Sequence, residues 1–218
     1  MIRAMNDPMP PSLANALLLI RHGETALNVA RILQPADTPL SARGVAQAEA
    51  LARRLVVMRL RAIVSSDLPR AWHTAEVIAA ATGAPIETTP LLQERNFGDW
   101  RGRPCDAMPA DPLTMREAPP NGESVPAFEA RVAAAFAHLL LRHGALGGPI
   151  AVVTHGLVLR ALLAVHATPE PGAVLPEQFG NTSLSILGAE KPHRATLLNS
   201  TTHLDAGERD DAKALSGG

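Results

Sequence analysis

Residues 17–28, Leu-Leu-Leu-Ile-Arg-His-Gly-Glu-Thr-Ala-Leu-Asn, form the stretch that decides the fold. The run Leu17–Ile20 is too short for a helix and has no alternating polar face, which predicts a central strand buried on both sides. Arg21 and His22 follow directly at its carboxyl end. Because ligands bind beyond the carboxyl ends of strands in open α/β sheets, these two side chains are candidates for a functional site.

The tripeptide Arg21-His22-Gly23 suits the binding and transfer of a phosphate group. A neutral imidazole is a nucleophile near physiological pH, and a guanidinium matches phosphate with parallel hydrogen bonds. We expect Gly23 to let backbone N–H groups approach the ligand where a helix begins. An isolated Arg-His-Gly is more often a turn with a satisfied surface histidine, so the functional interpretation needs further motifs.

Length and composition predict one globular domain. The chain has 218 residues, of which 46% are hydrophobic and 19% charged, enough to bury a substantial core. We expect this domain to span residues 1–204 and residues 205–218, rich in charged and small residues, to form a flexible tail. The net charge of -1 argues against a general polyanion binder, so we expect no nucleic acid partner.

The single cysteine and the first residues favour a cytoplasmic location. Cys105 cannot form an internal disulfide and has no zinc-finger spacing to other Cys or His residues, so we expect it to be inert. The amino terminus carries prolines and an acid where a signal peptide needs an apolar region. No apolar run approaches the ~20 residues that cross a bilayer, so we expect a soluble protein without a membrane partner.

The rest of the chain alternates short apolar runs with amphipathic stretches, which predicts helices packed on a mostly parallel sheet. One helix is expected to begin at Ser41, and a second to run from a cap at Ser65, Ser66 or Asp67 to Gly83. A third should run from Glu123 to His143, with Gly144 ending it and its charged residues solvated, and a fourth should begin over Leu157–Leu163. The expected strands are Ala62–Val64, Ile86–Thr88, Ile150–Val153, Thr182–Leu187 and Ala195–Leu198, of which the last two would lie at an antiparallel edge. Between Trp100 and Glu123 lies a segment rich in Pro, Gly and Asp, which we expect to cover the site.

A second His-Gly pair repeats the opening pattern. Ile150–Val153 leads into Thr154-His155-Gly156, and adjacent parallel strands would bring His22 and His155 together across one crevice. Arg70 falls in the first turn of a predicted helix, where a cation opposes the helix dipole and an anion would compensate it. Taken alone, Arg70 is equally a solvated arginine.

These motifs together resemble the histidine phosphatase superfamily, which has the phosphoglycerate mutase-like fold. The resemblance covers about Leu17 to Leu204 and rests on these groups, which occur in the family's order: Arg21-His22-Gly23, Pro39-Leu40 with Gly44 and Gln47, Ser66 with Arg70 and Thr74, Leu92 with Glu94 and Gly98, Gly122-Glu123-Ser124, Thr154-His155-Gly156, and Asn199 with His203-Leu204. It implies a three-layer α/β/α sandwich and chemistry without a metal or other cofactor.

The resemblance also implies roles for individual residues. His22 would be the nucleophile that is transiently phosphorylated, and Glu94 the proton donor that later activates water. The phosphate would be clamped by Arg21 and Arg70, contacted by His155, and bordered by Asn28. Two arginines and a donor histidine can serve where other enzymes use magnesium.

Departures from the family's mutases favour its phosphatase branch. Those mutases tend to have tryptophan at the position of Leu27 and Gly-Trp at Pro35-Ala36. They also carry a tyrosine after the catalytic glutamate and a paired-arginine insertion, whereas this chain has no tyrosine and continues Arg95-Asn96-Phe97-Gly98. We therefore expect a metal-independent phosphatase acting on a small phosphorylated metabolite.

Three alternatives remain open at this point. The first is a 2,3-bisphosphoglycerate-dependent phosphoglycerate mutase, and the second is a non-catalytic relative that binds a phosphorylated ligand. The third is a metal hydrolase built on His22 and His155, which is weakened because neither strand end supplies a further ligand at suitable spacing. The motifs do not choose the substrate or the oligomeric state, and a homodimer is among the arrangements left open.

Overall fold

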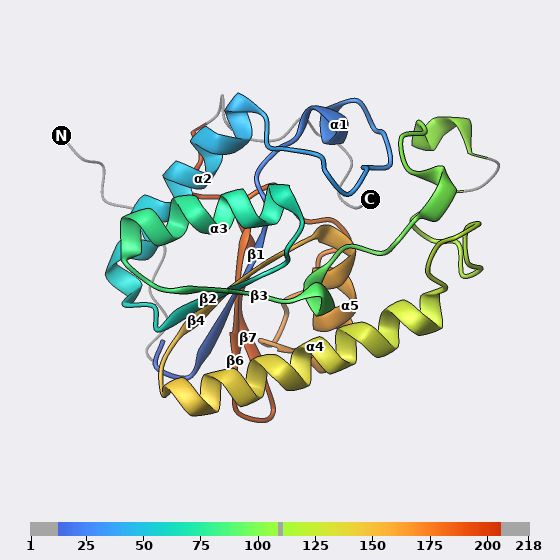
Figure 1. Cartoon of the computed structure of the whole chain (residues 1–218). Coiled ribbons are helices and arrows are strands. Elements are labelled where there is room, and N and C mark those ends of the chain that lie inside the picture. Colours follow the sequence, from blue (N-terminus) through green and yellow to red (C-terminus); the bar gives the residue numbers. More distant parts are fainter. Residues whose placement is uncertain (1–12, 109–110, 206–218) are drawn as a thin grey trace.

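The computed structural model describes residues 13–108 and 111–205, and its centre is a seven-stranded sheet in the order β3-β2-β4-β1-β6-β7-β5 (Figure 1). The strands are β1 (Ala16–Arg21), β2 (Ala62–Ser65), β3 (Ile86–Thr88), β4 (Ile150–Thr154), β5 (Thr168–Pro169), β6 (Leu184–Gly188) and β7 (Arg194–Ser200). Strands β1 to β4 run parallel, and β6 and β7 form the antiparallel part. The predicted mostly parallel sheet is confirmed; β5, only two residues long, was not anticipated.

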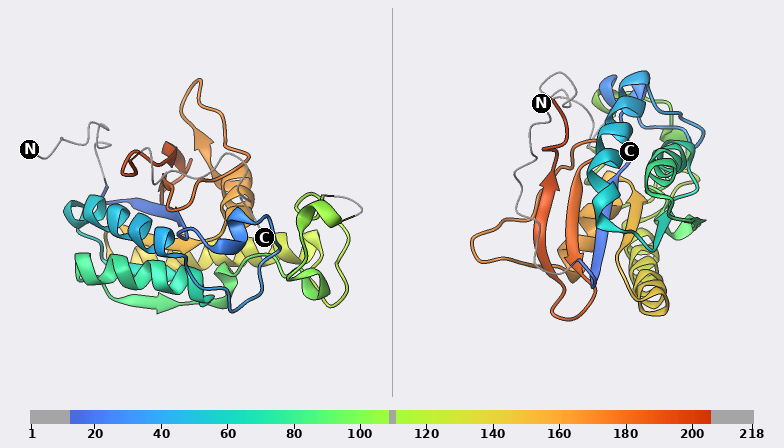
Figure 2. Two further views of the ribbon diagram at one scale, coloured as in Figure 1. Left: turned by 90° about the horizontal axis from the view of Figure 1, so that it is seen from above. Right: turned by 90° about the vertical axis from the view of Figure 1, so that its left-hand side faces the viewer.

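Helices cover both faces of this sheet, which gives three layers (Figure 2). They are α1 (Ala26–Val29), α2 (Ala42–Leu55), α3 (Pro69–Thr82), α4 (Val125–Leu146) and α5 (Gly156–His166). One apolar cluster joins the sheet to α2 and α3, and a second joins its opposite face to α4 and α5. The predicted α/β/α sandwich is therefore confirmed.

Strand β1 contributes to both apolar clusters. Leu17 and Leu19 pack on the side of α4 and α5, whereas Leu18 and Ile20 pack on the side of α2 and α3. All four side chains have no exposed surface. Complete burial on both faces is what a strand without polar alternation requires.

Two helix ends differ from the sequence-based expectations. Helix α4 continues past Gly144 and ends at Gly147, whose φ of 62° is the left-handed conformation that favours glycine. Helix α3 has Leu68 at its N-cap, whose side chain carries no acceptor, and begins with Pro69, which has no N–H. The predicted Ser/Asp cap of that helix was therefore wrong, and Ser66 is used elsewhere.

The connections around β1 and β4 open a crevice at the carboxyl edge of the sheet. These strands are hydrogen-bonded neighbours, with Arg21 paired to Thr154. The chain leaves β1 towards α2 on one face and leaves β4 towards α5 on the other face. Such a divergence is where ligands bind in open α/β sheets. Residues 101–108 and 111–122, which we call the covering segment after the expectation stated above, lie beyond the amino-terminal end of α4 in Figure 1 (green).

Some expectations fall outside the described residues. They concern the amino-terminal lead-in, residues 1–12, and all of the tail except Asp205. The division into a domain at 1–204 and a tail at 205–218 stays a prediction. None of the helices within residues 13–108 and 111–205 is long and apolar enough to cross a membrane.

Candidate active site

The two His-Gly motifs meet at the crevice between β1 and β4. The backbone N–H of His22 donates to the carbonyl of Thr154 at 2.9 Å, which continues the β1–β4 pairing by one residue. The imidazole rings of His22 and His155 have centroids 5.1 Å apart and are tilted by 57°. Both side chains are buried, with exposed fractions of 2% and 0%. The predicted juxtaposition of the two histidines is thus present in the structure.

The hydrogen bonding of His22 fixes which ring nitrogen can react. Its Nδ1 lies 2.7 Å from the carbonyl oxygen of Gly23, and because a carbonyl only accepts, Nδ1 carries the proton. The lone pair is therefore on Nε2, which makes no hydrogen bond to any described residue. Burial, followed by the charges of Arg70 and Arg21, holds the pKa of His22 well below its usual range. His22 is thus neutral at physiological pH.

Two buried arginines flank His22. Arg21 donates through Nη1 to the carbonyl of Phe179 at 2.6 Å, which anchors its guanidinium beside β1. Arg70 is only 1% exposed, yet its one hydrogen bond from the guanidinium is a 3.5 Å contact to the carbonyl of Pro35. Its Nε has no partner in the described part of the chain. A buried guanidinium with unused donors is suited to binding an anion.

His155 is held by Ser66 at the end of β2. The Nε2 of His155 lies 2.9 Å from Ser66 Oγ, which also accepts from the backbone N–H of Leu68. Burial first, and then the charges of Arg70, His22 and Arg21, hold the pKa of His155 well below its usual range. The imidazole of His155 is therefore neutral near physiological pH. Its Nδ1 is buried and has no partner among the described residues.

Glu94 is positioned by two backbone N–H groups. Its Oε1 accepts from Arg95 at 2.9 Å and its Oε2 from Leu157 at 3.1 Å, at the first turn of α5. The side chain is 4% exposed and lies within electrostatic range of Arg70. These contacts fix the carboxyl group at the edge of the same crevice. A carboxyl held in this way can exchange a proton with a group bound beside Arg70.

A buried ion pair between Arg131 and Glu123 supports the segment that carries Glu94. Arg131 donates twice to the Glu123 carboxylate, at 2.9 and 2.7 Å, and to the carbonyls of Leu91, Gln93 and, more weakly, Glu94. The two side chains are 19% and 15% exposed. The expectation that the charged residues of α4 are solvated was therefore wrong for Arg131, because its partners lie outside the helix and leave no periodic signal in it.

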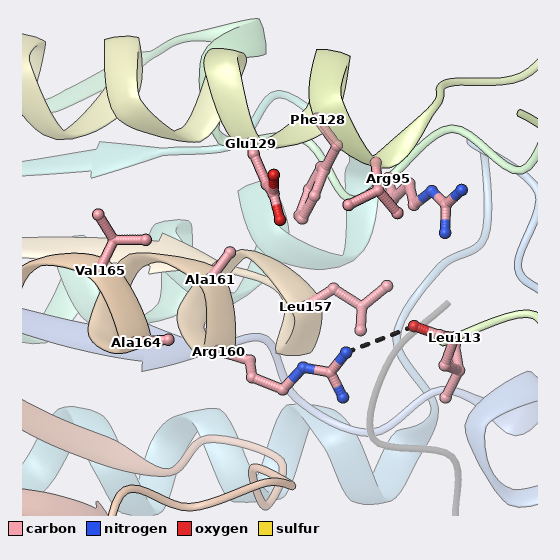
Figure 3. Close-up of a pocket in the computed structure, with 10 residues that line it drawn as sticks. Arg95, Leu113, Phe128, Glu129, Leu157, Arg160, Ala161, Ala164 and Val165 are labelled. Atoms are coloured by element: carbon pink, nitrogen blue, oxygen red, sulfur yellow. Dashed lines mark hydrogen bonds between the residues drawn. The ribbon is translucent and has the colours of Figure 1, made fainter. Parts of the chain in front are cut away.

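A groove lies between α4 and α5 (Figure 3). It has a volume of about 200 Å³ and is mainly apolar, with Phe128, Leu157 and Ala161 in its walls. The Nη2 of Arg160 donates to the carbonyl of Leu113 across one end. Arg95 and Leu157, which line this groove, are also the residues whose backbone N–H groups bind the Glu94 carboxyl.

A pair of glycines brings the loop after His22 against the start of α2. A Cβ on Gly23 would lie 2.4 Å from the carbonyl oxygen of Gly44, and a Cβ on Gly44 would lie 2.1 Å from that of Glu24. The backbone N–H of Gly23 donates to Thr74 Oγ1 at 3.0 Å. The N–H of Gly23 is thus used inside the protein, which corrects the expectation that Gly23 serves a helix-start anion site; α1 begins only at Ala26.

Asn28 lies next to the site and has structural partners. Its side chain and that of Thr25 form a capping box at the start of α1. Asn28 Oδ1 also accepts from Asn181 Nδ2, which donates in turn to the carbonyl of His22. Asn181 and Phe179 are the contacts that sequence reasoning missed. They lie in a Gly- and Pro-containing loop, and only the fold brings that loop beside β1.

Two of the other histidines pack against an aromatic ring. His166 stacks on Phe136 with centroids 4.0 Å apart, and His193 meets the same ring edge-on. Burial raises the pKa of the Cys105 thiol, as expected of an inert cysteine. Residues 13–108 and 111–205 contain no cluster of three or more His, Cys, Asp or Glu side chains that could hold a metal ion.

Comparison with known proteins gives a consistent match over nearly the whole chain. The sequence model of the histidine phosphatase superfamily (branch 1) matches residues 17–201. The chain is 32% identical over 211 residues to a Yersinia enterocolitica protein named "Probable phosphoglycerate mutase GpmB", covering 89% of this chain and 97% of the relative.

Two solved structures carry the names of phosphatases. A mycobacterial glucosyl-3-phosphoglycerate phosphatase superposes with a TM-score of 0.69 at 31% identity, covering 85% of this chain and 99% of that one. An Escherichia coli structure titled as a "putative alpha-ribazole-5'-P phosphatase" gives a TM-score of 0.72 at 31% identity, covering 85% and 96%.

Proposed function

The chain belongs to the histidine phosphatase superfamily, and on that premise we propose that it is a metal-independent phosphatase that hydrolyses small phosphate monoesters through a phosphohistidine on His22. The observation that carries the proposal is the neutral, unbonded Nε2 of His22 beside the buried guanidinium of Arg70, whose Nε lacks a partner among the described residues. A nucleophilic ring nitrogen beside a guanidinium that can bind phosphoryl oxygens suits in-line transfer of a phosphoryl group.

In the first step, the lone pair of His22 Nε2 attacks phosphorus and the bond from phosphorus to the ester oxygen breaks. Glu94, in its acid form, gives its proton to the departing oxygen, so an alcohol leaves and Glu94 becomes a carboxylate. Arg21, Arg70 and the neutral His155 donate hydrogen bonds to the phosphoryl oxygens and stabilise the charge that develops on them. The product is a phosphohistidine.

In the second step, the Glu94 carboxylate takes a proton from water while the water oxygen attacks phosphorus. The bond from phosphorus to Nε2 breaks, inorganic phosphate leaves and His22 is again neutral. The low pKa of His22 supports both steps, because it keeps the lone pair available before transfer and after it. The arginines supply the positive charge that a metal ion supplies in other phosphatases.

The alternative activity is phosphoglycerate mutase, which the name of the Yersinia relative suggests. Both activities share the phosphohistidine and differ in what accepts the phosphoryl group. The phosphatase names of two solved structures at 31% identity favour water as the acceptor.

The test is phosphate release from a panel of phosphate monoesters by the purified protein in the presence of EDTA. We expect release that EDTA does not reduce, and an acid-labile phosphoryl group on His22 after rapid quenching. His22→Ala should abolish both, whereas His138→Ala, a change on the half-buried face of α4, should alter neither. Transfer from a bisphosphate to a second acid without release would indicate the mutase. Tight binding of the esters without turnover would indicate a non-catalytic relative, and full activity of His22→Ala would refute the nucleophile.

A further inference from the structure

A loop of residues 178–183 holds the backbone of His22. The carbonyl oxygen of His22 accepts two hydrogen bonds from this loop, one from Asn181 Nδ2 at 3.0 Å and one from the backbone N–H of Thr182 at 3.2 Å. Asn181 and Thr182 have no exposed surface. Because the ring of His22 is attached to the backbone that this loop binds, the conformation of the loop helps to decide where the reactive Nε2 lies.

Thr182 has a backbone conformation that its side chain disfavours. Its φ of 53° lies in the left-handed region, which is rare for a β-branched residue. Such a conformation persists only where the surrounding contacts enforce it. The hydroxyl of Thr182 donates to the carbonyl of Asn181 at 2.7 Å and lies 3.1 Å from Nε2 of His203. His203 is therefore one of the contacts that hold Thr182 with its N–H directed at His22.

The hydrogen bond between His203 and Thr182 has a fixed direction. A threonine hydroxyl has one hydrogen, which here serves the shorter contact to a carbonyl oxygen that can only accept. Nε2 of His203 is therefore the donor to Thr182, and the lone pair of the ring is on Nδ1, which is buried and has no partner among the described residues. Burial, followed by the charges of Arg54 and Arg53, lowers the pKa of His203 to about 3, so the ring stays neutral.

The segment that carries His203 binds the same loop at a second place. Asn199, in β7, accepts from the backbone N–H of Gly180 at 3.0 Å through Oδ1 and donates to the carbonyl of Gln178 at 3.0 Å through Nδ2. Residues 199–203 therefore bind three residues of the loop. Through the loop, this segment is connected by hydrogen bonds to the backbone of His22.

We propose that His203 is a positioning residue for His22: it holds Thr182 in the left-handed conformation, and Thr182 in turn holds the backbone of the nucleophile. His203 acts through Thr182 and not on the substrate. This inference rests on the proposed phosphatase function, because it concerns the nucleophile of that reaction. It implies a specific defect when the contact is lost. Binding of the phosphate by Arg70 remains, whereas in-line attack by Nε2, which is sensitive to small displacements, becomes slower.

The first test is steady-state hydrolysis of nitrophenyl phosphate by two variants of His203. His203→Phe keeps a planar ring but removes the donor, and we expect kcat to fall about tenfold while KM stays within twofold. His203→Gln places an amide N–H near the position of Nε2, and kcat should recover to at least half of the wild-type value. A histidine that only stabilised the fold would show neither the fall in kcat at constant KM nor the recovery by glutamine.

The second test asks whether His203 acts through Thr182. Thr182→Val keeps the branched shape and removes the hydroxyl, so it should lower kcat about as much as His203→Phe, and combining the two changes should lower kcat little further. If His203→Phe does not fold, the fall in kcat of Thr182→Val carries the test. Wild-type kcat in His203→Phe or in Thr182→Val, or losses that multiply in the double variant, would overturn the inference.

The matched control is His143→Phe, which removes another largely buried histidine whose Nε2 lies 3.3 Å from a backbone carbonyl, that of Ala14. Ala14 precedes β1, so this contact is at the edge of the sheet away from the crevice. Stability should decrease in this variant while kcat stays at the wild-type value. A fall in kcat equal to that of His203→Phe would show that the loss is general, and would overturn the positioning role.

A measurement without substrate separates this inference from the phosphatase proposal. The backbone N–H of Thr182 should exchange with solvent about tenfold faster in His203→Phe than in the wild type, relative to the N–H of Leu19 in the middle of β1, and His203→Gln should restore the slow exchange. If the wild-type protein hydrolyses no ester, the phosphatase proposal fails, and this NMR experiment still decides whether His203 holds Thr182. An unchanged relative exchange rate would refute that contact.

Discussion

Replacing Arg131 by methionine should be the most damaging single change outside the crevice itself. Methionine keeps much of the volume and the helix propensity of arginine but removes every hydrogen bond of the guanidinium. The Glu123 carboxylate, 15% exposed, then loses the partner that binds both of its oxygens. The carbonyls of Leu91 and Gln93 lose their donors at the same time.

The magnitude follows from the burial of this pair. Removing one partner of a fully buried ion pair costs about 3–5 kcal/mol, because the other charge stays buried without compensation. The side chains of Arg131 and Glu123 retain 19% and 15% exposure, so we expect a value near the lower limit, about 3 kcal/mol. At about 2–4 °C per kcal/mol for a chain of this size, the melting temperature should fall by about 6–12 °C.

The assay is thermal unfolding followed by circular dichroism, with two further variants. Arg142→Met is the matched control, because Arg142 lies on the same helix and pairs with the more exposed Glu87, so its loss should be clearly smaller. The double variant Arg131→Met, Glu123→Gln removes both charges and should be more stable than Arg131→Met alone. A melting temperature of Arg131→Met equal to that of Arg142→Met would refute the reasoning.

Three further predictions concern the crevice. Arg70→Lys should lower kcat/KM about tenfold or more, because an ammonium lacks the planar fork that engages two phosphoryl oxygens; steady-state phosphate release measures it, and near-normal activity would remove Arg70 from the clamp. Glu94→Gln should slow phosphorylation of His22 about 100-fold with an alkyl phosphate, which needs protonation of its leaving group, but less than tenfold with nitrophenyl phosphate. Single-turnover quench experiments measure this step, and equal losses for both esters would show that Glu94 is not the acid. In NMR titrations, His22 and His155 should stay neutral below pH 6.5, and Arg70→Met should raise the pKa of His22 by removing the charge that lowers it most after burial. In the unfolded chain both imidazoles have their ordinary pKa near 6.5, so as the pH falls they bind protons before those of the folded protein do. The free energy of unfolding should therefore fall as the pH drops through that value. A pH-independent stability between pH 7 and 5 would contradict the burial of both neutral rings.

The parts of the site that could be predicted from the sequence are those that depend on strand ends. Leu17–Ile20 and Ile150–Val153 are apolar on both faces, so their burial and parallel pairing follow from composition, and with them the meeting of His22 and His155. Arg70 and Ser66 follow β2 in the same way. Here the local pattern and the fold agree, because both histidines are attached directly to strands that the pattern specifies, whereas Glu94 follows no such strand and came only from the family resemblance.

The contacts that escaped prediction join segments far apart in the chain. Phe179 reaches Arg21, and Arg131 reaches the carbonyls near Glu94, in each case through backbone groups that carry no sequence signal. The contact between Gly23 and Gly44 is of the same kind, because a glycine in a sequence does not reveal which backbone will pass 2–3 Å from its missing Cβ. Such contacts are set by the packing of elements and not by their periodicity.

These unpredicted contacts explain how the site can remain charged before a ligand binds. Burying Arg70 with an unused Nε is unfavourable, and the charge of Glu94 and the weak hydrogen bond to Pro35 offset only part of the cost. The surrounding contacts hold the site in place: Arg131 binds the carbonyls of Leu91 and Gln93, Arg95 binds those of Met115 and Glu117, and the glycine contact fixes the loop after His22 against α2. Because the hydrogen-bond donors of the site are already held in place, little of the binding energy of a phosphate ester is lost to reorganisation of the protein.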